Sequence, residues 1–337
     1  MTAQRDALPF LRAAGWGAAE RRHLAGDASD RSYERLFLDG RTAVLMDSPP
    51  GRGDDPADFV GIAAHLRGLG LSAPKVLAQD LAGGWLLLED LGDDLFARRI
   101  AAEPGLEQPL TLAAVEVLAH LQAAPAPAGL PDLSARDWAE AAGFAPDWYA
   151  FGAMGQRPDR TAFTEELARL QATHADGRRV LILRDYHAEN LIWLPDRAGP
   201  ARVGLLDFQL AQMGQPGYDL VSLVQDARRD VSAETAEAAV RRFLDLTGAE
   251  AEGFGTAFAV LGAQRALRII GVFARLGMVS GKTGYLTLIP RVWGHLRQNL
   301  SHPALSRLSG LCEAILPPPT PETLNRIRAQ CPTAPVR

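Results

Sequence analysis

The hydrophobic and polar positions of the first third of the chain follow strand and hairpin patterns. Two short apolar runs flank the dipeptide Asp39-Gly40, which is a strong local signal for a β-hairpin. The strand-like runs are residues 33–38, 41–46, 75–78 and 85–88, and the helix-like run is 58–69. This pattern predicts a small, mostly antiparallel sheet with one helix.

The pattern becomes helical beyond Gly92. Apolar residues recur at helical spacing in 111–122, and helical patterns continue to Ala314. The exception is the segment 180–208, where two short apolar runs flank polar loops. Most of the chain after residue 92 is therefore predicted to be helical.

The change of pattern predicts an α+β fold with two lobes. We expect a small antiparallel-sheet lobe over residues 1–92, with a hinge near 89–93, and a larger, mainly helical lobe over 93–316. Residues 317–337 form a proline-rich tail, in which the segment Pro317–Pro321 is expected to be extended.

Composition narrows the class of protein. The chain has 337 residues, of which 47% are hydrophobic and 22% charged, as in ordinary globular proteins. The net charge of −5 and the lack of a basic stripe argue against a nucleic-acid partner. The two cysteines, Cys312 and Cys331, form no zinc-binding spacing, so we expect a reducing compartment.

The longest apolar stretch predicts a buried helix rather than a membrane span. Residues 257–279 are interrupted by Arg265, Arg268 and Arg275, and arginine is costly inside a bilayer. The first six residues lack the basic start and apolar run of a signal peptide. We therefore expect a cytoplasmic protein with no membrane partner.

Three oxygen-bearing side chains form the most informative motif. Asp185 and Asn190 lie five positions apart on one loop, and Asp207 follows the next short apolar run. Phosphoryl transfer needs a carboxylate near the attacking hydroxyl and oxygen ligands for Mg²⁺. Protein kinases carry these groups in the same order, as H-R-D-x-x-x-x-N and D-F-G. The alternative interpretation is that the three residues only form turns and a strand-end cap.

This segment resembles the aminoglycoside and choline phosphotransferase superfamily, whose loop commonly reads H-G-D-x-H-x-x-N. Leu183 replaces the first His of that pattern, and Gln209 replaces an acidic residue or Gly in the second motif. The matching positions are Asp185, His187, Asn190, Asp207, Phe208, Gly214, Pro216, Asp219 and Leu220. The resemblance implies a protein-kinase-like fold, ATP and Mg²⁺ as cofactors, Asp185 as catalytic base, and Asn190 and Asp207 as metal ligands.

The sequence signals for nucleotide binding are weaker than those for the catalytic loop. Gly26, Ser29 and Ser32 are small residues before the first hairpin strand, where backbone N–H groups could approach phosphates. Glu89 and Leu91 follow a buried-type strand, in a segment that resembles the hinge whose backbone pairs with adenine. We therefore assign these five residues to ATP binding.

One residue departs from the kinase pattern. Met46 stands where kinases carry the lysine that contacts the α- and β-phosphates. Another cation, such as Arg31, Arg35 or Lys75, is expected to take its place. The alternative is a nucleotide-binding pseudokinase without turnover.

The amino-acid sequences of several segments resemble one branch of the superfamily. The segments are 26–29, 41–50, 184–193 and 218–231. They resemble the bacterial anomeric kinases that phosphorylate N-acetylmuramate and N-acetylglucosamine at C1 during cell-wall recycling. That branch also lacks the strand lysine, which implies an active ATP-dependent sugar kinase.

Four residues are assigned to substrate binding. His187 and Glu189 lie on the loop of Asp185, and Arg265 and Arg268 offer cations that could bind the lactyl carboxylate of muramate. The alternatives are intraprotein partners for these arginines and, for the whole protein, a kinase of an aminoglycoside, choline or homoserine-type acceptor. We expect a monomer whose partner is a small amino sugar.

Overall fold

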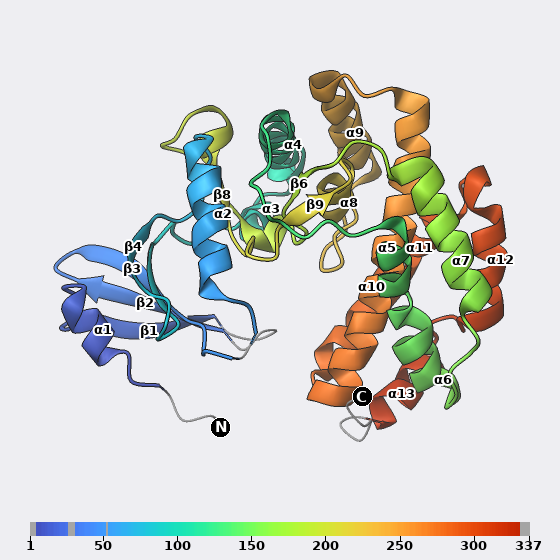
Figure 1. Ribbon diagram of the computed structural model, residues 1–337, viewed down its shortest axis with the longest axis horizontal. Coiled ribbons are helices and arrows are strands. Elements are labelled where there is room, and N and C mark those ends of the chain that lie inside the picture. The colour runs from blue at the N-terminus through green and yellow to red at the C-terminus, as the bar shows by residue number, and fades with distance from the viewer. Residues whose placement is uncertain (1–4, 26–30, 52, 331–337) are drawn as a thin grey trace. The chain divides into compact units, whose positions relative to one another are not determined.

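The computed structural model describes residues 5–25, 31–51 and 53–330 (Figure 1). The chain divides into two compact units. Unit 1 comprises Met1–Ala128 and Leu183–Ala211, and unit 2 comprises Gly129–Ile182 and Gln212–Arg337.

Unit 1 is built on a five-stranded antiparallel sheet with the strand order β1-β2-β3-β5-β4. Its elements are α1 (Leu8–Ala13), β1 (Glu20–Ala25), β2 (Ser32–Leu38), β3 (Arg41–Asp47), α2 (Pro56–Gly68), β4 (Val76–Asp80), β5 (Trp85–Glu89), α3 (Phe96–Ala102), α4 (Glu107–Ala123), β7 (Leu191–Trp193) and β8 (Val203–Leu205). The four predicted strands are present as β2, β3, β4 and β5, and the helix predicted over 58–69 is present as α2. Sequence patterns did not reveal α1 or β1.

The turn between β2 and β3 confirms the hairpin expected from Asp39-Gly40. Both residues have positive φ, 50° at Asp39 and 74° at Gly40. Two consecutive positive φ angles are the signature of the type I′ turn, whose twist matches that of the flanking strands. The hairpin fixes the register that opposes Tyr33 to Met46.

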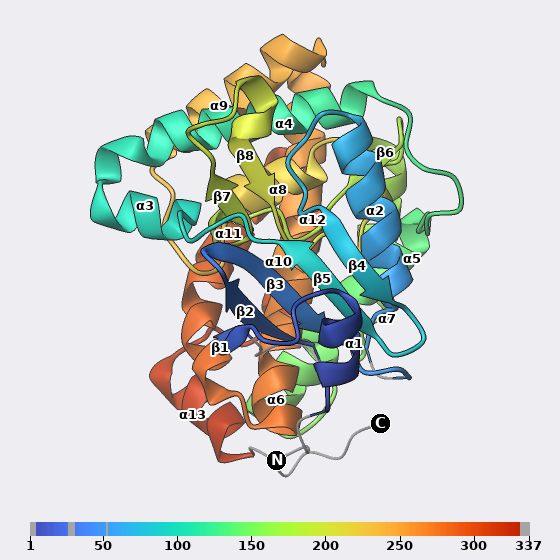
Figure 2. The ribbon, with the colours of Figure 1, turned by 90° about the vertical axis from the view of Figure 1, so that its left-hand side faces the viewer.

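The two faces of the sheet have different neighbours. Figure 2 looks onto the sheet with α1 in front of it. Leu11 of α1 forms one buried cluster with Leu36, Leu45 and Leu87. Because successive strand residues point to opposite faces, Val44 and its cross-strand partner Leu88 face away from α1. Those two side chains line the cavity described below.

The segment 183–211 joins unit 1 through backbone pairing. Strands β7 and β8 form a hairpin, and Leu205 donates its backbone N–H to the carbonyl of Ser72 at 2.9 Å. Trp193 donates its backbone N–H to the carbonyl of Asp94 at 2.8 Å. These bonds explain why a segment far along the chain belongs to the same compact unit as the sheet.

Unit 2 is mainly helical, with one two-stranded pairing of β6 and β9. Its helices and strands are α5 (Ala135–Ala142), α6 (Phe151–Met154), α7 (Thr161–Leu170), β6 (Val180–Ile182), β9 (Gln212–Gly214), α8 (Tyr218–Val224), α9 (Ala233–Thr247), α10 (Ala251–Ser280), α11 (Ile289–Leu300), α12 (Ser306–Ile315) and α13 (Pro321–Ala329). A π-helical segment, Ala145–Ala150, precedes α6. The mainly helical character of this part confirms the predicted fold class.

Helix α10 is the central element of unit 2. It is long and apolar enough to cross a membrane by length and composition, and 72% of its most apolar window is buried inside the protein. Val260, Leu267 and Ile270 are fully buried in the core of unit 2. A buried core helix passes the same length and composition test, and this is the role expected for residues 257–279.

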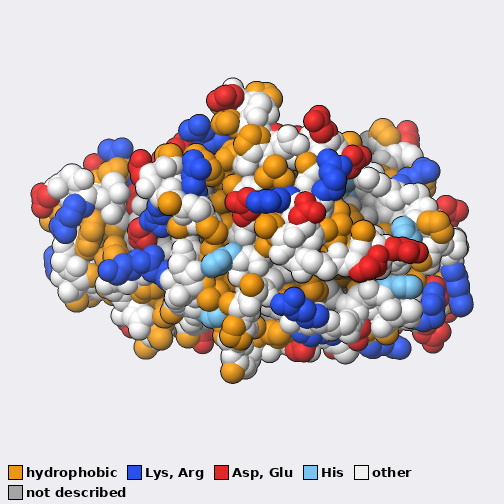
Figure 3. Space-filling model, turned by 90° about the horizontal axis from the view of Figure 1, so that it is seen from above, with side chains coloured by type: hydrophobic (Ala, Val, Ile, Leu, Met, Phe, Trp, Pro, Cys, Tyr) orange, Lys and Arg blue, Asp and Glu red, His pale blue; other side chains and the backbone are white. Residues whose placement is uncertain are grey.

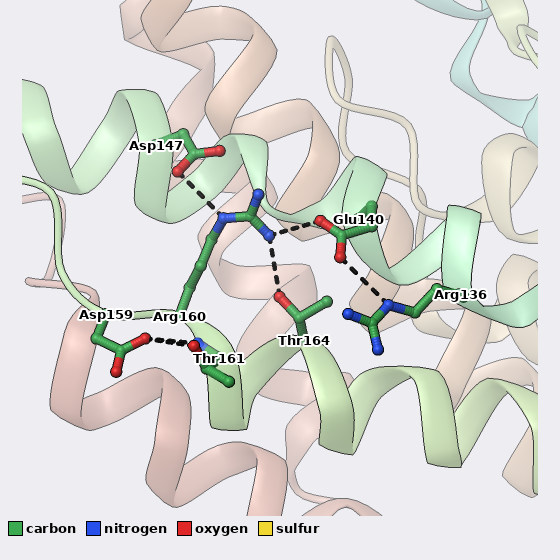
Figure 4. Close-up of polar contacts among 7 residues, drawn as sticks. All are labelled: Arg136, Glu140, Asp147, Asp159, Arg160, Thr161 and Thr164. Carbon is green, nitrogen blue, oxygen red and sulfur yellow. Dashed lines mark hydrogen bonds and ion pairs between the residues drawn. The ribbon is translucent and has the colours of Figure 1, made fainter.

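A charged cluster connects α5, the π-helical segment and α7 (Figure 4). The guanidinium of Arg160 donates to Glu140 at 2.8 Å, to Thr164 at 3.0 Å and to Asp147 at 3.2 Å. The hydrogen bond from Arg160 holds the pKa of Glu140 below its usual value. The cluster stabilises the packing of three neighbouring segments in unit 2.

The compact units do not follow the predicted division at residue 92. Unit 1 continues through α3 and α4 to Ala128 and also takes the hairpin of β7 and β8. The predicted lobe boundary at 89–93 is a hinge. A division into compact units does not test a hinge, so this boundary stays a prediction. Residues 317–320 contain no helix or strand, whereas 321–329 form α13.

The surface shows no gathering of basic side chains on the face drawn in Figure 3, where acidic and basic residues are interspersed. This agrees with the charge pattern of the sequence, in which both signs are spread along the chain.

Candidate active site

The loop that carries Asp185 has a strained backbone. Asp185 donates its backbone N–H to the carbonyl of Leu183 at 2.9 Å, and Arg184 between them has φ of 71°. A three-residue turn with positive φ at a non-glycine residue is rare and strained. Next to it, the buried hydroxyl of Tyr186 donates to the carbonyl of Ala114 on α4 at 2.9 Å. Strain of this kind clusters at functional sites, where the surroundings hold it in place.

Asn190 closes the same loop through its side chain. The amide Nδ2 donates to the backbone carbonyl of Asp185 at 2.9 Å. A carbonyl oxygen only accepts hydrogen bonds, so the amide nitrogen must be the atom on that side, and this fixes the orientation of the group. The Oδ1 atom of Asn190 therefore points away from Asp185 O.

The β7–β8 hairpin brings Asp207 beside Asn190. Leu191 pairs with Leu205, and Leu206 donates its backbone N–H to the carbonyl of Asn190 at 3.0 Å. Asp207 follows directly, with φ of 55°, a second strained non-glycine residue. The next side chain, Phe208, is fully buried. The ring of Phe208 stacks on Phe59 of α2 with centroids 4.7 Å apart, which anchors the turn at Asp207.

The carboxylate of Asp207 is held by two donors at one oxygen. Its Oδ1 accepts from Arg31 Nη2 and from Gln209 Nε2, both at 3.0 Å. Arg31 Nη2 and Gln209 Nε2 also lie 3.5 Å from Oδ2 of Asp54. Both donors are almost fully buried, whereas the side chain of Asp207 is 41% exposed. The carboxylate is therefore fixed at one oxygen and accessible at the other.

The donor set of Asn190 and Asp207 fits magnesium carried by a nucleotide. Mg²⁺ is usually held by one or two carboxylates plus substrate phosphates rather than by a cage of protein ligands. Among the described residues, no three His, Cys, Asp or Glu side chains gather at a possible metal site. An amide oxygen just before β7 and a half-exposed carboxylate just after β8 are the kind of partial site that a metal–phosphate complex would complete.

A cavity of about 410 Å³ opens beside these residues, within the range of small-molecule sites. Its lining residues are Leu24, Arg31, Tyr33, Arg35, Val44, Phe59, Pro74, Leu88, Glu89, Asp90, Leu91, Gly92, Asp93, Leu95, Arg98, Glu189, Asn190, Ile192, Leu206 and Asp207. The walls combine aliphatic side chains from the sheet and the β7–β8 hairpin with polar groups at two ends. Burial raises the pKa of Tyr33 to about 12.

One end of the cavity is formed by residues 89–93, which are predicted to form the hinge and are called the hinge segment from here on. Glu89 donates its backbone N–H to the carbonyl of Lys75 at 2.8 Å. Its carboxylate accepts from the backbone of Lys75 at 3.0 Å, from Arg67 at 3.3 Å and from Arg197 at 2.7 Å. The Glu89 side chain thus holds the segment in place.

Arg35 of β2 holds the other side of the hinge segment. Its guanidinium forms a two-point ion pair with Asp90, with Nε–Oδ2 at 2.9 Å and Nη2–Oδ1 at 3.0 Å. It also pairs with Asp93. The hydrogen bond from Arg35 holds the pKa of Asp93 below its usual value, and the two carboxylates raise the pKa of Arg35. The hinge segment is therefore tied to the sheet at both edges.

The assigned site residues fall into three groups. The structure gathers Asn190, Asp207, Glu89, Leu91 and Glu189 around one cavity. Asp185 is half-buried on the adjoining loop, and Ser32 begins β2. Gly26 and Ser29 lie outside the described residues. The role assigned to each of these residues stays a prediction.

Of the four residues assigned to substrate binding, His187 and Glu189 belong to unit 1, and Arg265 and Arg268 belong to unit 2. His187 is buried on the loop of Asp185, and its carbonyl accepts from the backbone of Asn190 at 2.8 Å. Arg265 is buried in unit 2 and donates to Ser222 Oγ at 2.8 Å and to the carbonyl of Gln225 at 3.2 Å. Arg268 is half-buried on the same helix. These contacts give Arg265 an internal partner, and its role toward a substrate remains a prediction.

Sequence patterns missed Gln209 and Asp54 as parts of the site. Gln209 stands where the resemblance leads one to expect an acidic residue or Gly, and its amide donates to Asp207. Asp54 lies in the loop before α2, remote from any motif. The replacement of the expected acidic residue or Gly by Gln209 could have indicated this contact, since an amide can donate a hydrogen bond that a carboxylate cannot.

Comparison with other proteins identifies relatives over nearly the whole chain. An N-acetylmuramate/N-acetylglucosamine kinase of Caulobacter vibrioides is 39% identical over 94% of this chain and 98% of its own length. A protein of the same name from Pseudomonas aeruginosa is 32% identical over 91% of this chain and 93% of its own. The match therefore includes both compact units.

Solved structures share the fold at low sequence identity. A microcompartment-associated aminopropanol kinase covers 90% of this chain and all of its own, with a TM-score of 0.61 and 18% identity. A choline kinase from Streptococcus pneumoniae covers 87% of this chain and all of its own, with a TM-score of 0.58 and 15% identity. Residues 20–254 match the phosphotransferase enzyme family. Since this match and the close relatives both extend over most of the sequence, the chain belongs to the phosphotransferase enzyme family.

Proposed function

We propose that the protein transfers the γ-phosphoryl group of ATP to the anomeric C1 hydroxyl of N-acetylmuramate and N-acetylglucosamine. The observation that carries the proposal is the pairing of β7 with β8. It brings the loop of Asp185 and Asn190 beside Asp207 at the edge of a ligand-sized cavity. The acceptor is taken from the names of the two relatives, which match this chain over both units.

The nucleotide is proposed to lie along the cavity from the hinge segment to Asp207. Val44, Leu88 and Leu206 line the cavity and offer apolar surface for a base. The backbone around Leu91 offers polar groups at the cavity edge. The phosphates would then reach Asn190 and Asp207, whose oxygens would hold Mg²⁺, and the metal would neutralise charge on the β- and γ-phosphates.

Asp185 is proposed to act on the acceptor. Its carboxylate accepts the proton of the C1 hydroxyl, the C1 oxygen forms a bond to the γ-phosphorus, and the bond between that phosphorus and the bridging oxygen of ADP breaks. An anomeric hydroxyl is more acidic than an ordinary alcohol, so a carboxylate is a sufficient base. Within the described part of the chain, no residue forms a hydrogen bond or ion pair with the Asp185 carboxylate, which leaves it accessible to an acceptor.

The physiological setting is proposed to be the recycling of cell-wall amino sugars in the cytoplasm, where ATP is available. The expected monomer is checked by light scattering of the purified protein. No nucleic acid or membrane is needed for this reaction.

An acceptor screen with γ-labelled ATP and magnesium tests the function. The panel contains N-acetylmuramate, N-acetylglucosamine, an aminoglycoside, choline and homoserine. We expect labelled products from the two amino sugars only, and we expect these products to release phosphate in mild acid, as anomeric phosphates do. Transfer to another acceptor alone would refute the amino-sugar assignment. Binding of Mg·ATP without turnover on any acceptor would favour a pseudokinase.

A further inference from the structure

Strand β3 carries Met46 at the position where the corresponding strand of kinases carries a lysine. Met46 is 1% exposed, and a thioether cannot neutralise a phosphate. In kinases a lysine here contacts the α- and β-phosphates. If this protein binds a nucleoside triphosphate, another cation must therefore reach the phosphates.

Three cations line the cavity in the part of the chain that the structure describes, namely Arg31, Arg35 and Arg98. Lys75 does not belong to the lining. Arg35 is bound to the hinge segment through Asp90 and Asp93. Arg98 is 67% exposed and lies 3.8 Å from Asp93, so it belongs to the same end. Arg31 is the cation at the end where the metal ligands lie.

The position of Arg31 suits a phosphate contact. It immediately precedes β2, its side chain is 7% exposed, and its Nη2 lies 3.0 Å from Oδ1 of Asp207. A phosphate that shares a metal with Asp207 must lie close to this guanidinium. The guanidinium presents five N–H donors in a planar fork, so it can keep Asp207 and also donate to phosphate oxygens.

We propose that Arg31 is the phosphate-contacting cation of this protein and replaces the lysine missing at Met46. Through the same guanidinium it orients Asp207 for the metal. The inference rests on the proposed function in taking Mg·ATP as the ligand and Asp207 as a ligand of its metal, and it holds for any acceptor.

The test compares binding of Mg·ATP and of adenosine by titration calorimetry, without a sugar. Arg31→Met and Arg31→Gln remove the charge, and Arg31→Lys keeps it. We expect the two neutral variants to bind Mg·ATP at least about tenfold more weakly and adenosine within about twofold of wild type. Arg31→Lys is expected to retain Mg·ATP affinity within about fivefold, because a point charge still attracts phosphate.

Two matched substitutions control for the loss of an arginine. Arg241→Met removes a largely exposed arginine of α9 that pairs with Glu237 at 3.5 Å, and it should change neither affinity. Arg35→Met disturbs the hinge segment and should weaken both ligands alike. Circular dichroism confirms that each variant is folded.

Equal weakening of Mg·ATP and adenosine by the neutral Arg31 variants would show that Arg31 only shapes the cavity, and would overturn the proposal. Unchanged Mg·ATP affinity in a folded neutral variant would overturn it as well. These binding measurements contain no acceptor. A failure of the acceptor screen would therefore refute the amino-sugar function, but it would not alter the measured ratio of Mg·ATP affinity to adenosine affinity.

Discussion

Each end of the cavity carries an arginine–aspartate ion pair, and the two pairs differ in how much of the aspartate side chain is exposed. At the hinge segment, Arg35 contacts both carboxylate oxygens of Asp90, whose side chain is 6% exposed. At the opposite end, Arg31 contacts one oxygen of Asp207, whose side chain is 41% exposed. A closed two-point pair fixes the backbone, whereas a pair that leaves an oxygen accessible can bind something else. The contrast separates a structural ion pair from a candidate metal and phosphate site.

The largest expected effect on activity comes from a substitution at Asp185, on the loop beside the Arg31–Asp207 pair. Asp185→Asn keeps the size of the side chain and removes the base, and we expect kcat to fall by about 10³-fold, within the usual range of general-base contributions. Mg·ATP affinity should stay close to that of wild type, because Asp185 is proposed to act on the acceptor and not to hold the nucleotide. The measurement is steady-state kinetics with calorimetric binding. Turnover within about tenfold of wild type, about 1.4 kcal/mol of barrier, would show that Asp185 is not the base.

Asp207→Asn tests the accessible carboxylate oxygen. The amide keeps one oxygen but loses the charge that attracts a metal, so we expect kcat/KM for ATP to fall by about a hundredfold, about 2.7 kcal/mol. Adenosine affinity should not change. Titration of turnover with Mg²⁺ checks the cause, since the variant should need more metal. A variant with the wild-type Mg²⁺ requirement would remove Asp207 from the metal site.

Arg35→Met tests the closed pair. It leaves the carboxylate of Asp90 buried without its partner, a loss of about 1–3 kcal/mol of stability. We expect a lower melting temperature and about tenfold weaker binding of both adenosine and Mg·ATP. Adding Asp90→Asn should recover part of the stability, since no unpaired charge then stays buried. Selective loss of Mg·ATP affinity would place Arg35, rather than Arg31, on the phosphates.

The smallest expected effect is the pH response of the hinge segment. The hydrogen bond from Arg35 holds the pKa of Asp93 below its usual 3.8. For a lowered carboxyl pKa, the stabilisation is present above the usual value and is lost only as pH falls through the lowered one. Adenosine affinity should therefore change by less than about twofold between pH 5 and 9. A titration midpoint inside that range would show that another group controls the hinge end.

Local patterns in the sequence predicted much of the fold. The Asp39-Gly40 dipeptide predicted the hairpin because only a few residue types tolerate its positive φ angles. The spacing of Asp185, Asn190 and Asp207 predicted a shared site, and the β7–β8 hairpin places Asn190 next to the residue that precedes Asp207. Their chemical roles stay predictions until they are measured.

Contacts between distant segments were beyond the reach of sequence patterns. Arg31 and Asp207 are separated by 176 positions, and the choice of Arg31 over Arg35 and Lys75 depends on which side chain the fold brings to Asp207. Gln209 and Asp54 likewise meet only in three dimensions. The division of the chain after Ala128 follows backbone pairing of the 183–211 segment, which no periodicity of the sequence reveals.

A crystal structure of the wild-type protein with Mg²⁺ and a non-hydrolysable ATP analogue tests the central claim most directly. We predict the adenine against the backbone of residues 89–91, the metal on Asn190 Oδ1 and Asp207, and a phosphate oxygen within hydrogen-bond distance of Arg31. A nucleotide bound elsewhere, or a metal held without Asn190 and Asp207, would contradict the account.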